Sequence, residues 1–195
     1  MEEGFQSTED KSPQLSDGMD YRSIIGALLY IYVCARPDVA ASVAILGRTE
    51  SAPTEADWIA AKRVVRYLKA TKEWRLKYSD AAGKLIGYSD ADWAGDVGTR
   101  RSTTGFVFHY AGGAVSWASR RQSCVTLSSM ESEYVVLSDA SQELIWLRSL
   151  LKDMGEQLSD PVKVISKAVS SSKRQNARVV GPSTLRCWTF RDATV

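Results

Sequence analysis

The sequence has few of the residues from which disulfide scaffolds, zinc sites and hydrolytic triads are built. Its three cysteines, Cys34, Cys124 and Cys187, lie far apart and form no Cys-x-x-Cys pair, which argues against a disulfide framework or a structural zinc site. The single histidine, His109, lies in the strand-like segment FVFHY, with no serine or cysteine nucleophile motif nearby. A hydrolytic triad is therefore not expected.

Long apolar runs are also missing. No stretch approaches the roughly 18 apolar residues that a membrane span needs. Residues 1–18 are acidic and polar, without the apolar core of a secretory signal peptide. We therefore expect the chain to act inside a cell, in the cytoplasm or nucleus, and not in a membrane.

The net charge of +2 is too small to indicate a partner, but the charge is unevenly distributed. From residue 161 onward the sequence has seven Lys or Arg and one acid, Asp192, which leaves the preceding part acidic. Basic tails are typical of segments that bind nucleic acid through counterion release, and also of segments that are only solvated. Both interpretations stay open.

The first part of the chain predicts a polar segment followed by helices. Residues 1–20 are rich in Ser, Asp, Glu and Gln, which predicts a flexible leader. Residues 21–72 predict three helices, with a break near Pro37 and a start of the third helix at Pro53 and Thr54. We expect this small helical unit to expose an apolar face when it is alone.

The pattern changes at residue 74. Segments 74–80 and 85–90 alternate around a turn, which predicts a hairpin or two neighbouring strands. Residues 103–128 predict three more strands, separated by turns at a Gly-Gly pair and at an Arg-Arg-Gln sequence. Residues 162–166 predict one further strand.

The strongest helix signal covers residues 129–153. Its apolar residues recur at alternating intervals of four and three, at Met130, Tyr134, Leu137, Ala140, Leu144, Leu147 and Leu151. Together the elements predict the α/β fold class: a mixed sheet of three antiparallel strands, a long helix and a fourth strand, preceded by a small helical segment.

The stretch LIGYSDADWAGD, residues 85–96, places Asp90, Asp92 and Asp96 directly after an apolar run. Carboxylates at a strand end can bind hard cations such as Mg²⁺, which prefer oxygen ligands. Aspartate is also common in the turns that follow strands. The stretch by itself therefore leaves a metal site and a polar turn as alternatives.

A metal site needs a carboxylate from a second element, and the long helix offers Glu131 and Glu133. Glu131 follows Ser128 by three residues and matches a capping box, which is a sufficient structural role. Glu133 has no such role and lies at the edge of the apolar face. We therefore predict that Glu133 is the second ligand.

Two arginine pairs and one tryptophan are candidates for nucleic-acid contacts. They are Arg100, Arg101, Arg120, Arg121 and Trp93. Loop arginines contact phosphates or are simply solvated. An exposed indole after the aspartates can stack on a base or ribose, although core packing is the commoner role of tryptophan.

Over residues 20–162 the chain resembles copia-type retrotransposon Pol polyproteins, in the region where the reverse transcriptase tail precedes the ribonuclease H domain. The resemblance rests on segments that occur in the same order: YRSIIGALLYI–ARPD, AAKRVVRYLKAT, LIGYSDADWAGD–TRRSTTGFVF, AVSWASRRQSCVTLSSMESEY and ELIWLRSLLKDMG. It implies a reverse transcriptase remnant at 21–72, an incomplete ribonuclease H-like domain at 74–166 and an aperiodic basic tail at 167–195.

The resemblance also implies a chemistry. In this family two Mg²⁺ or Mn²⁺ ions cut the RNA strand of an RNA/DNA hybrid, held by an Asp on the first strand, a Glu on the first helix and an Asp after the fourth strand. Asp90 and Glu133 match the first two positions, and Asp92 is a secondary neighbour. The implied partners are the hybrid and the missing reverse transcriptase domain.

The third position departs from the family. The family usually reads Cys-Asp-Asn-x-Ser-Ala, whereas this chain reads VISKAVSSS, with Lys167 and Ala168 at the Asp and Asn positions. Two unit charges about 4 Å apart interact by roughly 1 to 4 kcal/mol, and the interaction between a lysine and a divalent metal ion is repulsive. We therefore expect weak or absent activity, and a degenerate or truncated C-terminal region.

A second class of function also stays open. The chain is then a non-catalytic binding protein, including a secreted RxLR-type effector related to copia fragments that binds a host protein inside a host cell. The segment RYLK at 66–69 is only a near match to RxLR. A product without function is a third interpretation that the sequence does not separate from the first.

Overall fold

The computed structural model describes residues 12–16, 18–79, 83–96, 98–156 and 162–166. The chain forms two compact units. The first contains the described residues up to Leu76 together with 96–100, and the second contains 77–95 and the described residues from Arg101 onward. No helix in these ranges is both long and apolar enough to cross a membrane.

The first unit is helical, and the three predicted helices are present. They are α1 (Met19–Cys34), α2 (Ala40–Leu46) and α3 (Glu55–Ala70), with short 3-10 turns η1 (Pro37–Val39) and η2 (Gly47–Thr49) on either side of α2. Tyr21, Ile25 and Leu28 of α1 lie in the core with side chains of α2 and α3. The opposite face of α1 exposes Met19 and Tyr30, so the predicted apolar surface exists.

Residues 12–16 belong to the predicted flexible leader, but their backbone is attached to the start of α3. The amide of Leu15 donates to the carbonyl of Pro53 (2.9 Å), and the carbonyl of Pro13 accepts from the amide of Glu55 (3.1 Å). Thr54 caps α3, because its hydroxyl accepts from the amide of Asp57 and the Asp57 carboxylate accepts from the Thr54 amide. These bonds fix the beginning of α3.

A buried ion pair joins the ends of α1 and α3. The guanidinium of Arg36 donates to Asp38 (2.7 Å) and to both the hydroxyl and the carbonyl of Thr71 (2.7 and 3.2 Å), and it lies over the ring of Tyr67. The side chains of Arg36 and Asp38 are 9% and 1% exposed. The hydrogen bond to Asp38 raises the pKa of Arg36.

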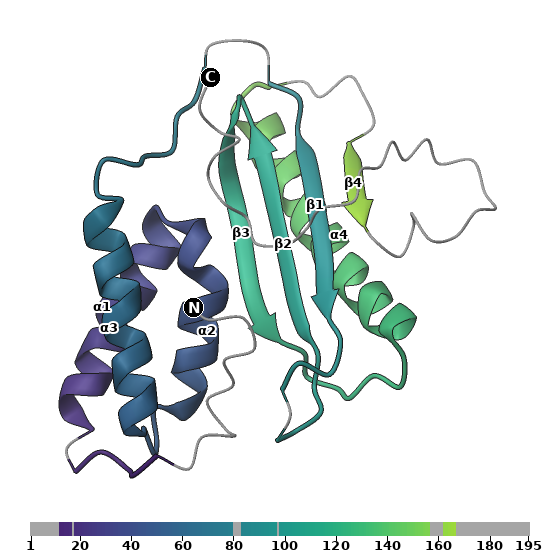
Figure 1. Ribbon diagram of the computed structural model, residues 1–195. Helices are drawn as coiled ribbons and strands as arrows, with labels where there is room; N and C mark the ends of the chain where they lie inside the picture. Colours follow the sequence, from purple (N-terminus) through teal and green to yellow (C-terminus); the bar gives the residue numbers. More distant parts are fainter. Residues whose placement is uncertain (1–11, 17, 80–82, 97, 157–161, 167–195) are drawn as a thin grey trace. The chain divides into compact units, whose positions relative to one another are not determined.

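The second unit is a four-stranded sheet covered on one face by α4 (Figure 1). Its elements are β1 (Ile86–Asp92), β2 (Thr103–Tyr110), β3 (Gly113–Arg121), α4 (Ser129–Asp153) and β4 (Lys163–Ser166). The order across the sheet is β3-β2-β1-β4, with β4 parallel to β1 and the other neighbours antiparallel. The predicted α/β fold class, with a ribonuclease H-like order of elements, is confirmed.

Two predicted strands are wrong. Residues 74–79 form no strand. The amide of Ser79 donates to the carbonyl of Ala111 (2.8 Å), but one such backbone bond does not make a strand ladder. Residues 122–128 are irregular and lead from β3 to α4. The hairpin turn is shifted by one residue, since Ala111 and Gly112 have positive φ and Gly113 already belongs to β3.

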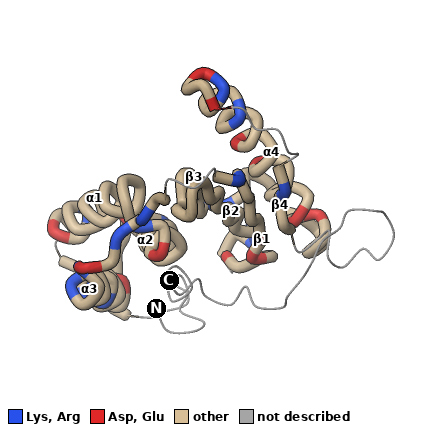
Figure 2. The backbone as a smooth tube through the Cα atoms, turned by 90° about the horizontal axis from the view of Figure 1, so that it is seen from above, with Lys and Arg blue, Asp and Glu red and all other residues tan. Residues whose placement is uncertain are grey.

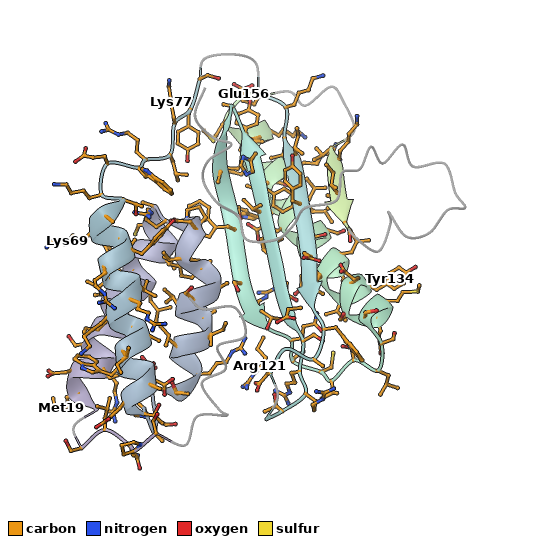
Figure 3. The ribbon with its side chains drawn as sticks, viewed as in Figure 1. Met19, Lys69, Lys77, Arg121, Tyr134 and Glu156 are labelled. Carbon is orange, nitrogen blue, oxygen red and sulfur yellow. The ribbon has the colours of Figure 1, made fainter. Side chains whose placement is uncertain are left out.

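The buried face of α4 differs in part from the predicted stripe. Ala140, Leu147 and Leu151 belong to the buried cluster that packs against the sheet, as predicted, and Val136 is also fully buried. Met130 and Tyr134 are 57% and 61% exposed, and Figure 3 shows Tyr134 pointing away from the sheet. In the first two turns the buried positions are Ser132, Glu133 and Val136, because polar contacts orient this end of the helix.

The ion pair in the helical unit gives a stability prediction. Arg36→Leu leaves the Asp38 carboxylate buried without its partner, which typically costs about 3 to 5 kcal/mol. We expect a large fall in the unfolding midpoint, measured by chemical denaturation. Arg22→Leu is the control, because Arg22 is exposed and its substitution should change the free energy of unfolding by less than about 0.5 kcal/mol. Equal losses in both variants contradict the prediction.

Candidate functional site

Asp90 lies in β1, two residues before the strand ends. It pairs with Gly105 of β2, while its neighbour Ser89 pairs with Phe106 and is buried beneath α4. Because side chains alternate along a strand, the Asp90 carboxylate points to the other face of the sheet. Its Oδ1 atom is buried and accepts no hydrogen bond among the described residues. A buried carboxylate oxygen of this kind suits a cation or a donor from a ligand.

The residues that follow Asp90 form a turn. Asp92 is exposed, and its carboxylate folds back over Gly95, in the space that a Cβ would take. Trp93 is 45% exposed, and its indole N–H donates to the carbonyl of Thr126 (3.3 Å). The tryptophan is therefore fixed at its nitrogen, while much of its surface faces solvent. Asp96 is buried and accepts from the Thr99 hydroxyl (2.8 Å), which gives it a local role.

A buried pair of hydroxyls holds this turn in place. The Ser102 hydroxyl accepts from the amide of Ala94 (3.1 Å) and contacts the hydroxyl of Thr126 at 2.9 Å. Ser102 is fully buried and Thr126 nearly so. The sequence reasoning missed both residues. Their signal is weak: Ser102 lies in a predicted loop, where serine is ordinarily solvated, and Thr126 lies in a predicted strand, where its type indicates no particular partner.

Glu133 lies in the first turns of α4 and is 7% exposed, with its Oε2 atom buried. The predicted capping box is confirmed in part: Ser128 is the N-cap, but the Glu131 side chain bonds another amide. The Ser128 hydroxyl accepts from the Glu131 amide (3.2 Å), and the Glu131 carboxylate accepts from the amide of Leu127 (2.6 Å), one residue before the position that a standard capping box uses. Glu131 and Glu133 thus differ in environment: Glu131 is exposed at the cap and Glu133 is buried.

One side chain links the start of α4 to the sheet. The amide nitrogen of Gln122 donates to the carbonyl of Ser132 (3.0 Å) and to the hydroxyl of Thr104 (3.3 Å). Thr104 pairs with Ala91, the residue after Asp90. Asp90 and Glu133 are therefore held at the same end of the sheet. If this end of the sheet bound a divalent cation, Asp90 and Glu133 would be the residues that hold it.

The third predicted position, Lys167, lies outside the described residues. Ser166, the last residue of β4, pairs with Ser89, the residue before Asp90. Among the described residues no group of three or more His, Cys, Asp or Glu side chains is arranged to hold a metal ion. The carboxylates of Asp90 and Glu133, with the buried Oδ1 atom of Asp90, fit part of a metal site. A pair of divalent ions requires more oxygen ligands than these two residues supply.

The candidate arginines differ in their surroundings. Arg120 forms an ion pair with Asp139 of α4 (3.1 Å). Arg121 is exposed at the end of β3 (Figure 3), and it pairs with Thr103, which in turn pairs with Asp92. Arg121 is therefore at the same end of the sheet as the aspartates. Arg100 is exposed with positive φ, and Arg101 is half-buried.

Figure 2 shows acidic and basic positions along α4. Glu131 in the first turn and Lys152 in the last turn suit the helix dipole, whereas Asp153 at the C-terminal end does not. His109 is half-buried and packs edge-on against Tyr88, and burial lowers its pKa. Cys34 and Cys124 are free thiols, and Cys187 lies outside the described residues. These groups form no second catalytic cluster in the described part of the chain.

No protein-family model and no solved structure matches the chain. It is 52% identical over 128 residues to the secreted RxLR effector protein 161 of Plasmopara viticola. This alignment covers 65% of this chain and 90% of that protein. It is 42% identical over 135 residues to the retrovirus-related Pol polyprotein from transposon TNT 1-94 of Nicotiana tabacum, and 41% identical over 150 residues to that from transposon RE2 of Arabidopsis thaliana.

The matches to the two Pol polyproteins cover 69% and 76% of this chain but only 10% of each polyprotein. The chain thus spans about a tenth of their length and nearly the whole length of the effector protein. The likeness continues through both units, as the order of sequence segments indicated. The chain therefore belongs to the family of copia-type retrotransposon Pol polyproteins and their short relatives.

Proposed function

We propose that the sheet unit is a ribonuclease H-like domain whose ancestral reaction is the metal-dependent hydrolysis of RNA in RNA/DNA hybrids. The observation that carries the proposal is the placement of Asp90 and Glu133 at one end of the sheet, each with a buried carboxylate oxygen. The names of the Pol polyprotein relatives support the retrotransposon origin of the chain.

The reaction is impaired in this chain. Asp90 and Glu133, with Asp92 as a secondary ligand, would hold Mg²⁺ or Mn²⁺. When bound, such an ion lowers the pKa of its water and stabilises the charge of the leaving oxygen. The family resemblance puts Lys167 where the third carboxylate is expected, and a lysine repels divalent ions there. The chain has two of the three expected carboxylate ligands, Asp90 and Glu133, and we therefore expect little or no turnover.

Restoring the third carboxylate tests this proposal. In an RNA/DNA hybrid-cleavage assay with Mg²⁺ or Mn²⁺, the native chain should be close to the uncatalysed background. Lys167→Asp should tighten Mn²⁺ binding and raise cleavage, because it removes a repulsive charge and adds a ligand. Adding Asp90→Asn or Glu133→Gln to Lys167→Asp should abolish both gains.

Lys163→Asp is the matched control, because it makes the same charge change at an exposed position of β4. An equal gain from Lys163→Asp assigns the effect to net charge. Absence of any gain from Lys167→Asp, or activity that survives Asp90→Asn and Glu133→Gln together, rejects the nuclease assignment.

Hybrid binding by the end of the sheet gives a separate prediction. We propose that Arg121 and Trp93 contact the hybrid, with Arg100 and Arg101 in the connecting loop, while Arg120 contributes less because Asp139 pairs with it. Arg121→Gln should weaken hybrid binding and lower the slope of log affinity against log salt by about 0.9. Arg148→Gln, an exposed change on α4, should leave the slope unchanged. Equal slopes for both variants contradict the assignment.

A second function is favoured by one comparison. The chain aligns with 90% of the secreted RxLR effector protein 161 at 52% identity, so a non-catalytic, effector-type role through binding a host protein is the alternative. RYLK, the near match to RxLR, lies within α3. The effector role predicts secretion from the native cell and binding that survives Asp90→Asn with Glu133→Gln. Retention of the full-length chain inside the native cell, measured by immunoblot of the medium, contradicts it.

A further inference from the structure

Gln122 occupies an unusual position between β3 and α4. It is 4% exposed, and its backbone amide donates to the carbonyl of Ser102 (2.8 Å). Its side chain donates to the carbonyl of Ser132 and to the hydroxyl of Thr104. All three partner residues are completely buried. Gln122 thus joins the turn after β1, the second strand and the first turn of α4 at one point.

The two side-chain bonds bear directly on the candidate ligands. Ser132 precedes Glu133, and Thr104 pairs with the residue that follows Asp90. α4 makes two other polar contacts with the sheet, from Ser116 to Glu143 (2.6 Å) and between Arg120 and Asp139 (3.1 Å), and both lie further along the helix. Of these polar contacts, the hydrogen bond from Gln122 to the carbonyl of Ser132 is the nearest to Glu133. Because a hydrogen bond is directional, it orients the first turn of α4 and the Glu133 side chain with it.

The chemistry of Gln122 fits this role better than that of a spacer. Its Oε1 atom is buried and has no hydrogen-bond partner among the described residues. A buried acceptor without a donor destabilises a fold. An apolar side chain of the same length would fill the space without that cost, but it would supply no donor to Ser132 or Thr104. The amide is therefore useful for the bonds that its nitrogen makes.

We propose that Gln122 is a positioning residue for Glu133. It fixes the first turn of α4 so that the Glu133 carboxylate lies at the end of the sheet that carries Asp90. This inference rests on the proposed function in assigning Glu133 to a metal site, while the orientation of Glu133 is a property of the chain itself.

The variant that tests the proposal is Gln122→Met, which keeps the length of the side chain and removes both donors. The matched control is Leu147→Ala, which weakens the packing of α4 near its other end. The ¹³C chemical shift of the Glu133 carboxylate and the amide exchange of residues 132–136 are measured by nuclear magnetic resonance. Gln122→Met should change the chemical shift of the Glu133 carboxylate, and Leu147→Ala should not. Amide exchange of residues 132–136 should be about tenfold faster in Gln122→Met than in Leu147→Ala, even if Leu147→Ala lowers Tm more.

Metal affinity gives the second measurement, in the chain that carries Lys167→Asp. In that chain Gln122→Met should raise the Mn²⁺ Kd by roughly tenfold, because loss of a residue that orients a metal ligand typically weakens metal binding by that amount. Leu147→Ala should change the Kd by less than about twofold. Mn²⁺ binding is read from the loss of the free-ion electron paramagnetic resonance signal.

The outcomes separate the two proposals. If the Lys167→Asp chain binds no Mn²⁺, or if Glu133→Gln leaves its affinity unchanged, the proposed function fails. The Glu133 shift and the exchange of residues 132–136 still decide the role of Gln122. If Gln122→Met leaves both as in the native chain, or if Leu147→Ala changes them equally, Gln122 is not a positioning residue.

Discussion

The packing of α4 against β1 and β2 is the contact on which the rest of the sheet unit depends. Phe108 of β2 is fully buried and lies over Gly87 of β1, where a Cβ would stand 2.5 Å from the ring. Ala140 and Leu147 of α4 belong to the same buried cluster as Phe108. The absence of a side chain at Gly87 lets the ring lie flat on β1, so the helix can approach the strand that carries Asp90.

Apolar packing and polar contacts have separate tasks in this unit. The apolar cluster holds the middle and the C-terminal half of α4 on the sheet, and it supplies most of the favourable free energy of burial. The polar contacts of Ser102, Gln122 and Thr126 gather at one end, where they attach the turn after β1 and the first turn of α4. They contribute less to stability, but they are directional and determine where the two carboxylates lie.

The sequence predicted the parts of this arrangement that depend on periodicity. Helix 129–153, the fourth strand and the capping role of Glu131 follow from spacings that the chain shows directly. Residues 123–128 are predicted as a strand, because alternation does not reveal that Gln122 and Thr126 bond to residues far away in the sequence. For the same reason Tyr134 was placed in the buried stripe. Asp90 and Glu133 follow from residue type, from the capping role of Glu131 and from the family resemblance. Gln122 lies in a predicted turn, where neither its type nor its spacing indicates a long-range contact.

The interactions that hold the fold are distinct from those that a metal reaction needs. The packing of Phe108 on Gly87 and the hydrogen bonds of the Ser102 and Thr126 hydroxyls involve neither the Asp90 nor the Glu133 carboxylate. Clustered carboxylates repel one another, and sites built for catalysis are often destabilising in the absence of their ligand. Because the contacts that hold the sheet unit together do not involve the two carboxylates, the fold does not depend on whether Asp90 and Glu133 bind a metal.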